Sequence, residues 1–373
     1  MRSLLRWVPL CVVVTAPELP LGAQERTTLG GYGEVHYTNA TGPATPGAVN
    51  FARFVAYLAH TFSDRIALRS EVELEDAKVE GGKAGGEVGL EQAYLDYRLT
   101  DWLTLRTGLV LVPVGIINET HEPPTFHGVN RPAVDHDLLP TTWREIGVGA
   151  VGAVPGVTGV SYRVYLVNGL RADSFSAGEG IREGRQEGRQ ASFANPSVTG
   201  RLEWARPGLK IGGSFWYGGS ANADSVLGTG SFAAPVALVS ADARYDAGAA
   251  SFRGVVANIS LSDAAAIDAR YATTVGSRMA GGYLEGAYDL LHALAPASPQ
   301  RLSAFVRHER YDTQADVPAG VTRDASFARR ITTLGLTYKP TWNTAFKGDY
   351  QWFRNAGGAG EHEVLSLGVG YQF

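Results

Sequence analysis

The side chains with the greatest chemical potential in this sequence lie close together between Asn118 and Arg144. This stretch combines histidines with carboxylates, the side chains that bind zinc and related ions in proteins. The spacing matches no metal motif, and no two of the histidines stand four residues apart, as two ligands on one helical face would. We therefore expect no metal and no cofactor. The residues concerned are His121, Glu122, His127, Asp135, His136 and Asp137.

The same stretch contains the only local set of residues that would suit a hydrolase, Asp135-His136-Asp137. A histidine oriented by an aspartate can activate a nucleophile. No Gly-x-Ser-x-Gly nucleophile motif accompanies the set. We therefore expect no enzymatic activity, and a hydrolase site within 118–144 is the alternative. Outer-membrane hydrolases are usually small barrels, so the number of strands discriminates between the two.

The beginning of the chain has the pattern of a secretion signal. Arg2 and Arg6 precede a short apolar stretch, and the small residues Gly22 and Ala23 offer a cleavage site, so we predict a signal peptide over 1–23. Cys11, the only cysteine, lies within that segment, so disulfides and thiolate chemistry are not expected in 24–373. The formal net charge of -4 argues against nucleic acid as a partner.

The elements that must position these residues are strands. Gly-rich, aromatic-rich sequence without long apolar runs is typical of many short strands. The connections after even-numbered strands are short, apart from the longer link 291–300, and those after odd-numbered strands are long, as in bacterial outer-membrane barrels. We predict sixteen strands, over 29–38, 51–62, 66–75, 88–99, 103–112, 145–154, 159–167, 197–205, 209–218, 236–245, 249–259, 279–290, 301–311, 329–338, 343–353 and 362–373.

The two faces of these strands differ in polarity. In 66–75, for example, Leu68 and Val72 alternate with Arg69 and Glu71. A charge facing lipid at mid-bilayer costs about 2–4 kcal/mol, so the charged face must line a water-filled bore. The fold class is therefore an all-β, sixteen-stranded antiparallel transmembrane barrel. The predicted pore-lining residues are Arg53, Arg69, Glu71, Glu73, Asp96, Arg106, Arg163, Arg201, Arg253, Arg307 and Lys347.

The last strand ends on an aromatic residue. Leu365, Leu367 and Val369 share one face with Tyr371 and Phe373, and the residues between them are small or polar. We interpret Tyr371 and Phe373 as the signal by which the barrel assembly machinery recognises the strand. With the predicted signal peptide, this indicates export to the outer membrane of a Gram-negative cell, where lipid surrounds the barrel.

Several segments resemble the phosphate-selective porin O and P family. They are GLEQAYLDYR at 89–98, DWLTLRTG at 101–108 and VPVGIINE at 112–119, together with GYGEVHY at 31–37, VYLVNG at 164–169, FVRHERYD at 305–312 and FKGDYQ at 346–351. The resemblance implies a sixteen-stranded porin domain over 24–373, commonly a homotrimer, through which small hydrophilic solutes or ions diffuse passively.

The resemblance also implies a ladder of arginines and a ring of lysines in the phosphate-specific members. That ring has no counterpart here, because 113–144 contains Arg131 and Arg144 but no lysine. The inner arginines favour anions and the acidic residues of the loop oppose them. The sequence therefore predicts a porin of this family, with the transported solute open.

The connection 113–144 is predicted to be the third long loop and to fold into the bore. Its prolines stiffen it, as suits a constriction, and its apolar members would pack on the barrel wall. The predicted constriction residues are Glu119, His121, Glu122, His127, Arg131, Asp135, His136 and Asp137. The alternating charges of 182–189 predict a mobile, solvated segment, and 263–271 is compatible with a short helix.

Overall fold

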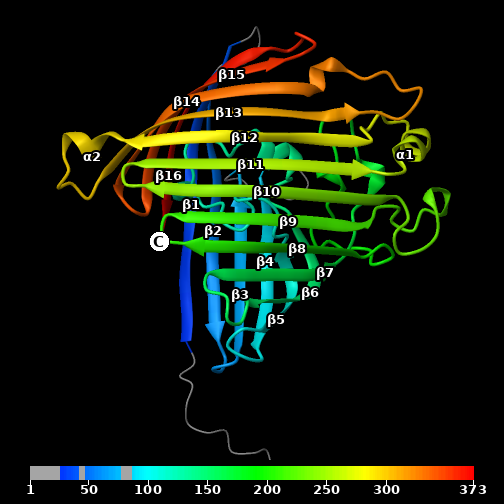
Figure 1. Ribbon diagram of the computed structural model, residues 1–373, viewed down its shortest axis with the longest axis horizontal. Coiled ribbons are helices and arrows are strands. Elements are labelled where there is room, and N and C mark those ends of the chain that lie inside the picture. The colour runs from blue at the N-terminus through cyan, green and yellow to red at the C-terminus, as the bar shows by residue number, and fades with distance from the viewer. Residues whose placement is uncertain (1–25, 42–46, 77–85) are drawn as a thin grey trace, which may run out of the picture.

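The computed structural model describes residues 26–41, 47–76 and 86–373 (Figure 1). Sixteen antiparallel strands form one sheet, in which each strand pairs with its neighbours in sequence and β1 pairs with β16. The sheet is therefore a closed barrel, as predicted, and it has no free edge. The predicted signal peptide, 1–23, lies outside the described residues.

The strands match the predicted segments within a few residues at most ends. Their bounds are β1 Arg26–Ala40, β2 Ala48–Thr61, β3 Ile66–Glu75, β4 Glu87–Arg98, β5 Thr104–Leu111, β6 Arg144–Ala153, β7 Val160–Val167, β8 Ser197–Arg206, β9 Leu209–Gly219, β10 Pro235–Ala247, β11 Ala250–Leu261, β12 Arg278–Asp289, β13 Arg301–Asp316, β14 Ala328–Thr341, β15 Thr344–Asn355 and β16 His362–Gln372.

The connections alternate in length, which gives the barrel a short-turn end and a long-loop end. The one longer link at the short-turn end contains the helix α2, Leu290–Leu294, and the helix α1, Ala264–Tyr271, occupies the long loop between β11 and β12. The long loops also contain short helical turns, at Pro123–Thr125, Val134–Leu138, Ala172–Ser174, Arg182–Gly184, Ser225–Leu227 and Ala325–Phe327.

The outer face of the barrel is apolar. Leu166, Leu202 and Val256 each expose more than two fifths of their surface, as do many similar side chains on other strands. Aromatic residues near the short-turn end also point outward, where the interface of a bilayer would lie. Among them are Phe62, Tyr97, Trp204, Tyr245 and Tyr288. No helix in the described part of the chain is long and apolar enough to cross a membrane.

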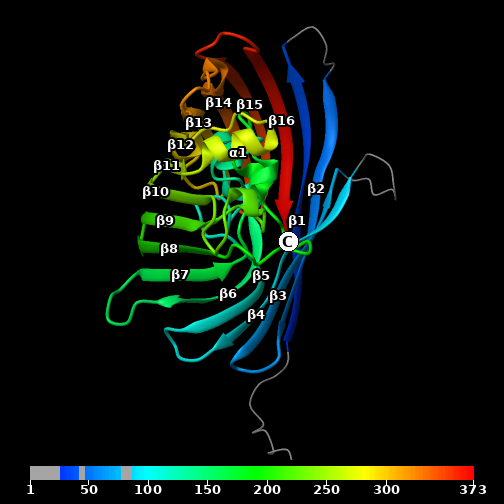
Figure 2. The same ribbon diagram turned by 90° about the vertical axis from the view of Figure 1, so that its right-hand side faces the viewer.

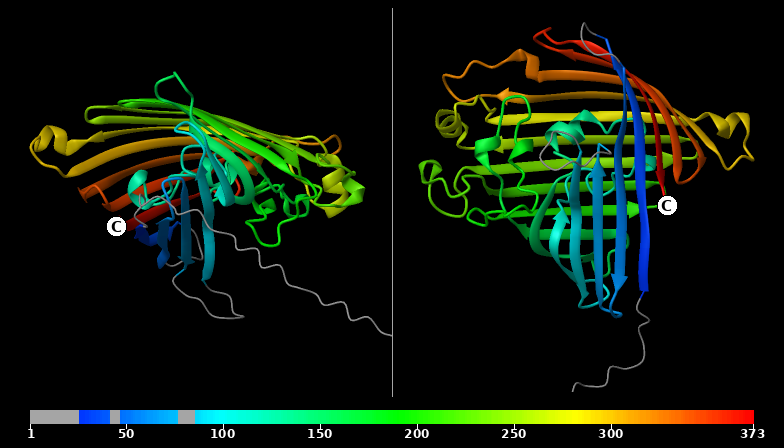
Figure 3. Two further views of the ribbon diagram at one scale, coloured as in Figure 1. Left: turned by 90° about the horizontal axis from the view of Figure 1, so that it is seen from below. Right: turned by 180° about the vertical axis from the view of Figure 1, so that it is seen from behind.

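Opposite walls of the barrel cross at a steep angle. In Figure 1 the wall β7–β14 runs across the view, and β1–β4 behind it run up and down; Figure 3 shows the same crossing from behind. Strands of a closed barrel tilt by roughly 35–45° from its axis, so the strands of facing walls cross at about twice that tilt. Figure 2 shows the long-loop segments gathered beside α1.

The pairing register of the described strands shifts at four places, and two of these irregularities lie among β1–β4. One lies between β1 and β2 after Glu34, and the other lies between β3 and β4, where Glu71 pairs with Gln92 but Val72 pairs with Leu90. Glu91 is the extra residue of the second bulge, and it is completely buried. Strict alternation would place Glu91 on the lipid face with Ala93 and Leu95. The bulge turns its carboxylate inward instead, so this charge does not face lipid.

Candidate functional site

The connection between β5 and β6, residues 112–143, crosses the bore, and we call it the inner loop. Its apolar side chains are buried, among them Val134, Leu139 and Trp143. The Trp143 ring packs 4.4 Å from that of Trp216 on β9. The interior of the barrel is therefore partly filled by its own chain.

One asparagine closes the neck of the inner loop. The Asn118 amide donates to the carbonyl oxygens of Val112, at 2.7 Å, and Trp143, at 2.8 Å. Its own oxygen accepts from the Trp143 backbone N–H at 2.8 Å. Asn118 is fully buried, so these bonds form away from water and join the two ends of the inner loop.

Basic side chains of the far wall bind the backbone of the inner loop. Arg244 on β10 donates to the Ile116 carbonyl at 2.9 Å, and Arg253 on β11 donates to the Thr125 carbonyl at 2.9 Å. Lys339 on β14 donates a hydrogen bond to the Pro124 carbonyl. These cations of the wall therefore fix the loop in place.

Acidic side chains complete this set of contacts. Asp349 on β15 accepts from the Val129 N–H at 2.6 Å, and Glu309 on β13 accepts from the Val134 N–H at 3.0 Å. Charge-assisted bonds of this kind are roughly twice as strong as neutral ones. The inner loop is thus bonded to strands on the opposite side of the barrel from its own attachment.

Glycines on the inner face of β16 leave room for the loop. A Cβ added to Gly370 would lie 2.3 Å from Cβ of Pro123, and one added to Gly368 would lie 3.0 Å from Val129. The small inward residues of the last strand therefore permit the inner loop to lie directly against the wall.

Most of the predicted pore-lining arginines form ion pairs with neighbouring carboxylates. Arg201 binds Asp242 through two hydrogen bonds of 2.6 and 2.8 Å, and Arg307 lies between Glu285, at 3.2 Å, and Glu309, at 2.8 Å. Their charges are thus largely compensated where they stand. The other pairs are Arg53 with Glu34 and Glu73, Arg106 with Asp96, Arg163 with Glu119, and Arg253 with Glu285.

Three predicted pore-lining residues have other surroundings. Arg69 on β3 is exposed. Glu71 on the same strand accepts a hydrogen bond from Gln92. Lys347 on β15 is buried, with Nζ 3.8 Å from the centre of the Phe126 ring, a cation–π contact with the inner loop.

The predicted constriction residues lie at separate places along the inner loop. His121 meets Glu91, with 3.1 Å between Nε2 and Oε2, and the His127 ring stacks on Phe305. Glu122 accepts from the Tyr57 hydroxyl, and Arg131 lines a hollow at the long-loop end. His136 contacts Asp137, which also accepts from Tyr311 and Arg329. The structure therefore does not bring the three histidines together.

Segment 182–189 differs from its prediction as a mobile, solvated segment. Arg182 donates to the carbonyl oxygens of His136 and Thr141, and Arg185 donates to those of Pro140 and Thr142. The prediction was wrong for these arginines, because carbonyl groups at the end of the inner loop provide partners that sequence spacing does not show.

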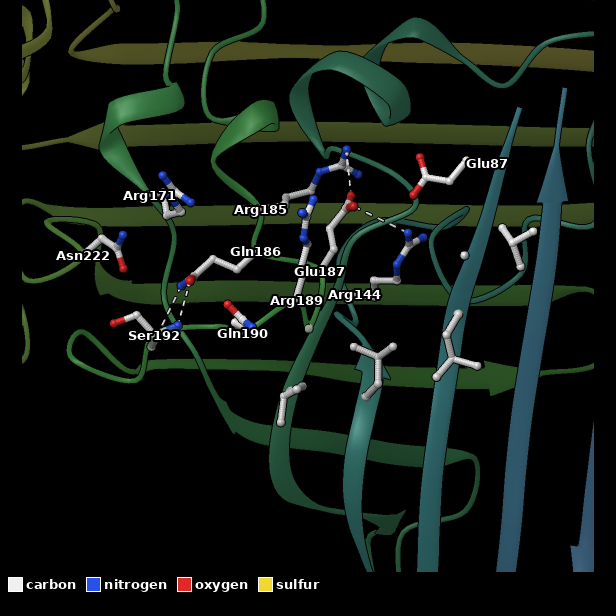
Figure 4. Close-up of a pocket in the computed structure, with 16 residues that line it drawn as sticks. Glu87, Arg144, Arg171, Arg185, Gln186, Glu187, Arg189, Gln190, Ser192 and Asn222 are labelled. Atoms are coloured by element: carbon white, nitrogen blue, oxygen red, sulfur yellow. Dashed lines mark hydrogen bonds and ion pairs between the residues drawn. The ribbon is translucent and has the colours of Figure 1, made fainter. Parts of the chain in front are cut away.

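An arginine-rich hollow of about 700 Å³ lies at the rim of the long-loop end, where β4 extends beyond its pairing with β5 (Figure 4). Arg144 and Arg185 share one carboxylate, that of Glu187, at 3.5 and 3.3 Å. Arg171 and Arg189 also line the hollow and are exposed. Its lining residues thus carry four guanidinium groups against the carboxylates of Glu87 and Glu187.

Asp135 gives the inner loop a pH dependence. The pKa of this carboxyl is raised to about 7, chiefly by burial; Glu309 and Asp242 also raise it, and Tyr283 and Arg307 lower it. A released, hydrated loop would have a pKa near 3.9 at this position. The seated loop therefore binds this proton more tightly than the released loop does. Between about pH 4 and pH 7, each unit of pH increase lowers the equilibrium constant for seating by up to about tenfold.

We expect the Asp135→Asn variant to remove this dependence, because the amide resembles the protonated acid. Single-channel recordings would compare the time spent in larger-conductance states at pH 5 and pH 8. Wild type should show more of that time at pH 8, the Asp135→Asn variant should not, and Glu183→Gln, on an exposed side chain, should behave as wild type. Identical pH profiles for wild type and Asp135→Asn would contradict the assignment.

Sequence reasoning missed three residues that organise the site. Glu91 faces inward only because of the bulge, and Asn118 had no signal beyond its place at the start of the loop. Asn168, at the start of loop 168–196, donates to Glu145 at 2.6 Å and accepts from the Ile146 N–H at 2.9 Å. An asparagine next to a strand end, followed by glycine as in Asn168-Gly169, is the one hint that the sequence offered.

Comparison with known proteins gives a relative and several similar folds. An uncharacterized protein of Aquifex aeolicus (strain VF5) is 35% identical over 335 residues, which cover 87% of this chain and 74% of that protein. No family model matches the sequence, so the resemblance to the phosphate-selective porin O and P family stays a prediction.

Among solved structures, the chain is similar to OmpF of Salmonella typhi, to the outer membrane channel DcaP of Acinetobacter baumannii and to a trimer form of OmpT, an outer membrane protein of Vibrio cholerae. The TM-scores are 0.58, 0.58 and 0.56 at 15%, 11% and 12% identity. The matches cover 93%, 94% and 94% of this chain and 97%, 97% and 100% of the others. At such identities the likeness establishes the fold alone.

Proposed function

Because this chain belongs to the same protein family as the Aquifex aeolicus relative and has the sixteen-stranded barrel fold of the outer-membrane porins, we propose that it is an outer-membrane porin. It forms a water-filled channel through which small hydrophilic solutes or ions diffuse passively. The observation that carries the proposal is the inner loop, which wall side chains hold across the bore. A loop fixed in this way suits a constriction of constant size.

The charge of the rim hollow supports a preference for anions. We propose that solutes entering from the long-loop end come near the hollow, where the exposed Arg189 raises the local concentration of anions. Arg171 contributes less, because Asp173 binds it at 2.6 Å. The wall arginines deeper in the bore contribute less, because carboxylates next to them compensate their charge. We therefore place the anion preference at the entrance of the channel, and the phosphate preference of the resembling family is not part of the proposal.

The proposal includes a location and partners. The apolar outer face suits the lipid of a Gram-negative outer membrane, and a homotrimer is the assembly we propose. Tyr371 and Phe373 remain the proposed signal for the barrel assembly machinery. In the folded barrel, Phe373 closes the sheet through backbone hydrogen bonds of 2.8 and 3.0 Å with Gly31. Deleting Phe373 and measuring the yield of heat-resistant barrel in the outer membrane tests this role.

Conductance in planar lipid bilayers tests the channel. Purified protein should insert with discrete current steps that are proportional to voltage. In a salt gradient, the reversal potential should have the sign of an anion-preferring channel. A folded barrel that inserts but carries no current would contradict the proposal.

We expect a charge-reversed rim to change this selectivity. In the variant that combines Arg171→Glu and Arg189→Glu, the hollow loses two positive charges and gains two negative ones, so the reversal potential should move toward cation preference. Arg206→Glu, on an exposed side chain at the short-turn end, is the matched control for charge far from the rim. Equal reversal potentials for wild type and the double variant would show that solutes do not pass the hollow.

We also propose that the barrel is not a hydrolase. Asp137 is engaged by His136, Tyr311 and Arg329, and the side chain of Asp135 is completely buried. The Asp-His-Asp segment thus connects the inner loop to the wall. Peptide or lipid cleavage by purified protein that His136→Ala abolishes would establish the enzymatic alternative.

A further inference from the structure

Three potential metal ligands from three segments converge where the inner loop meets β3 and β4. They are Glu71 on β3, Glu91 in the bulge of β4 and His121 on the inner loop. One oxygen or nitrogen atom from each side chain lies within 4.8 Å of the other two. The chain residues are 20 to 50 positions apart, so the barrel pairing and the seating of the loop create this arrangement.

The β-bulge is what brings Glu91 into this group. With regular pairing, Glu91 would point to the outer face and Gln92 alone would point to the bore. The bulge directs both side chains inward, so that Gln92 donates to Glu71 while Glu91 meets His121. Bulges are frequent next to functional sites because they re-aim side chains in this way.

The charges at this place do not balance. Glu91 is completely buried, and its Oε1 atom has no hydrogen-bond partner, whereas Oε2 accepts from the Tyr32 hydroxyl at 3.2 Å. Glu73 is also buried, and its Oε1 has no hydrogen-bond partner and lies 3.6 Å from Arg53. A buried carboxylate oxygen without a partner is costly, and a cation would satisfy it.

His121 is oriented as a metal ligand. Its Nδ1 atom lies 3.0 Å from the carbonyl oxygen of Asn118. A carbonyl oxygen can only accept a hydrogen bond, so Nδ1 carries the hydrogen and donates it. Nε2 then faces Glu91. Histidines that bind metals usually donate the other ring N–H to a carbonyl or carboxylate in this manner. The same Asn118 that closes the neck of the inner loop therefore also fixes the ring.

We propose that Glu71, Glu91 and His121 form a binding site for a divalent transition-metal ion such as Zn²⁺, with water completing the coordination. An imidazole among the ligands favours such ions over Ca²⁺ and Mg²⁺, which prefer a larger set of oxygen ligands. Zn²⁺ binds at about 2.0–2.2 Å, which puts tetrahedral ligand atoms about 3.4 Å apart. Since the three atoms are at most 4.8 Å apart, a small movement of the half-buried Glu71 closes the site.

A bound ion would connect β3, β4 and the inner loop directly. Nε2 of His121 lies 3.1 Å from Oε2 of Glu91, so a bound ion would replace this direct contact between the two ligands. Because the ligands span the loop and the wall, occupancy should also restrain the inner loop and reduce fluctuations of the channel current.

Zn²⁺ titration of the full-length purified barrel tests the site. The protein is first treated with a chelator, and isothermal titration calorimetry then measures stoichiometry and affinity for Zn²⁺ and for Ca²⁺. We expect one Zn²⁺ per chain and much weaker binding of Ca²⁺. Glu91→Gln, His121→Gln and Glu71→Gln should each weaken Zn²⁺ binding at least tenfold. His292→Gln, on an exposed histidine at the short-turn end, should bind as wild type.

Heat-modifiable migration in gel electrophoresis shows which variants are folded, and Glu71→Gln is the mildest change because Glu71 is only half-buried. Undiminished Zn²⁺ binding in a folded Glu71→Gln or Glu91→Gln variant would overturn the proposal. So would the absence of Zn²⁺ binding to wild type, or Ca²⁺ binding of equal strength.

Discussion

The Arg307→Met variant should lose about 3–5 kcal/mol of unfolding free energy, because it removes one partner of a buried ionic network. Arg307 exposes 1% of its surface and binds Glu285 and Glu309, and it also donates to the His127 carbonyl at 3.4 Å. Methionine leaves two buried carboxylates with less compensation and releases one contact of the inner loop. Urea unfolding in lipid vesicles, followed by tryptophan fluorescence, measures the loss.

Two further variants isolate the cause. Arg310→Met changes an exposed arginine on the outer face of the same strand and should cost little. Adding Glu309→Gln to Arg307→Met removes one of the uncompensated charges, so the double variant should regain part of the loss. If Arg307→Met unfolds at the same urea concentration as wild type, the network does not contribute to stability.

The Asn118→Leu variant should release the inner loop from its neck. The leucine side chain has a similar size but forms no hydrogen bonds. The buried Trp143 N–H therefore loses its acceptor, and the carbonyl oxygens of Val112 and Trp143 each lose one donor. An unsatisfied buried group costs about 1–3 kcal/mol. At 1.4 kcal/mol per factor of ten, a loss of about 3 kcal/mol raises the population of released loop by about two orders of magnitude.

Single-channel recording reads out this release as frequent transitions to a larger conductance. Limited proteolysis offers a second measurement, because chymotrypsin can cut after the buried Phe126 only when the loop leaves the wall. Asn130→Leu, on an exposed asparagine of the same loop, is the control and should resemble wild type. If the Asn118→Leu channel shows no transitions to a larger conductance and resists the protease, the wall contacts alone hold the loop.

The strands were predictable because their physics is local. Alternation of polar and apolar residues, together with turn residues at one end and long loops at the other, identified all sixteen strands. The same rule failed at Glu91, because a bulge breaks the period of two at one residue without a mark in the sequence. A local pattern of alternation predicts regular strand pairing, but it does not predict where a β-bulge interrupts that pairing.

The partners of the charged residues were not predictable. Arg253 was predicted to line a wet lumen, and Lys339 was not among the predicted residues. Both bind carbonyl groups of the inner loop more than 100 residues away. Arg182 and Arg185 alternate with acidic residues, which favours a solvated segment, and they too bind loop carbonyls. Sequence spacing contains no information on which distant backbone groups a barrel brings within reach.

The bonds between the inner loop and the far wall have a mechanical consequence. Val129 and Asp349 are 220 residues apart, and Pro124 and Lys339 are 215 apart, so each contact joins opposite sides of the cylinder. Through these hydrogen bonds the inner loop acts as a strut across the diameter of the barrel. It therefore opposes flattening of the cylinder under the lateral pressure of the bilayer. The hydrogen bonds can form only after the last strands have been added, so the strut is set in the final stage of folding.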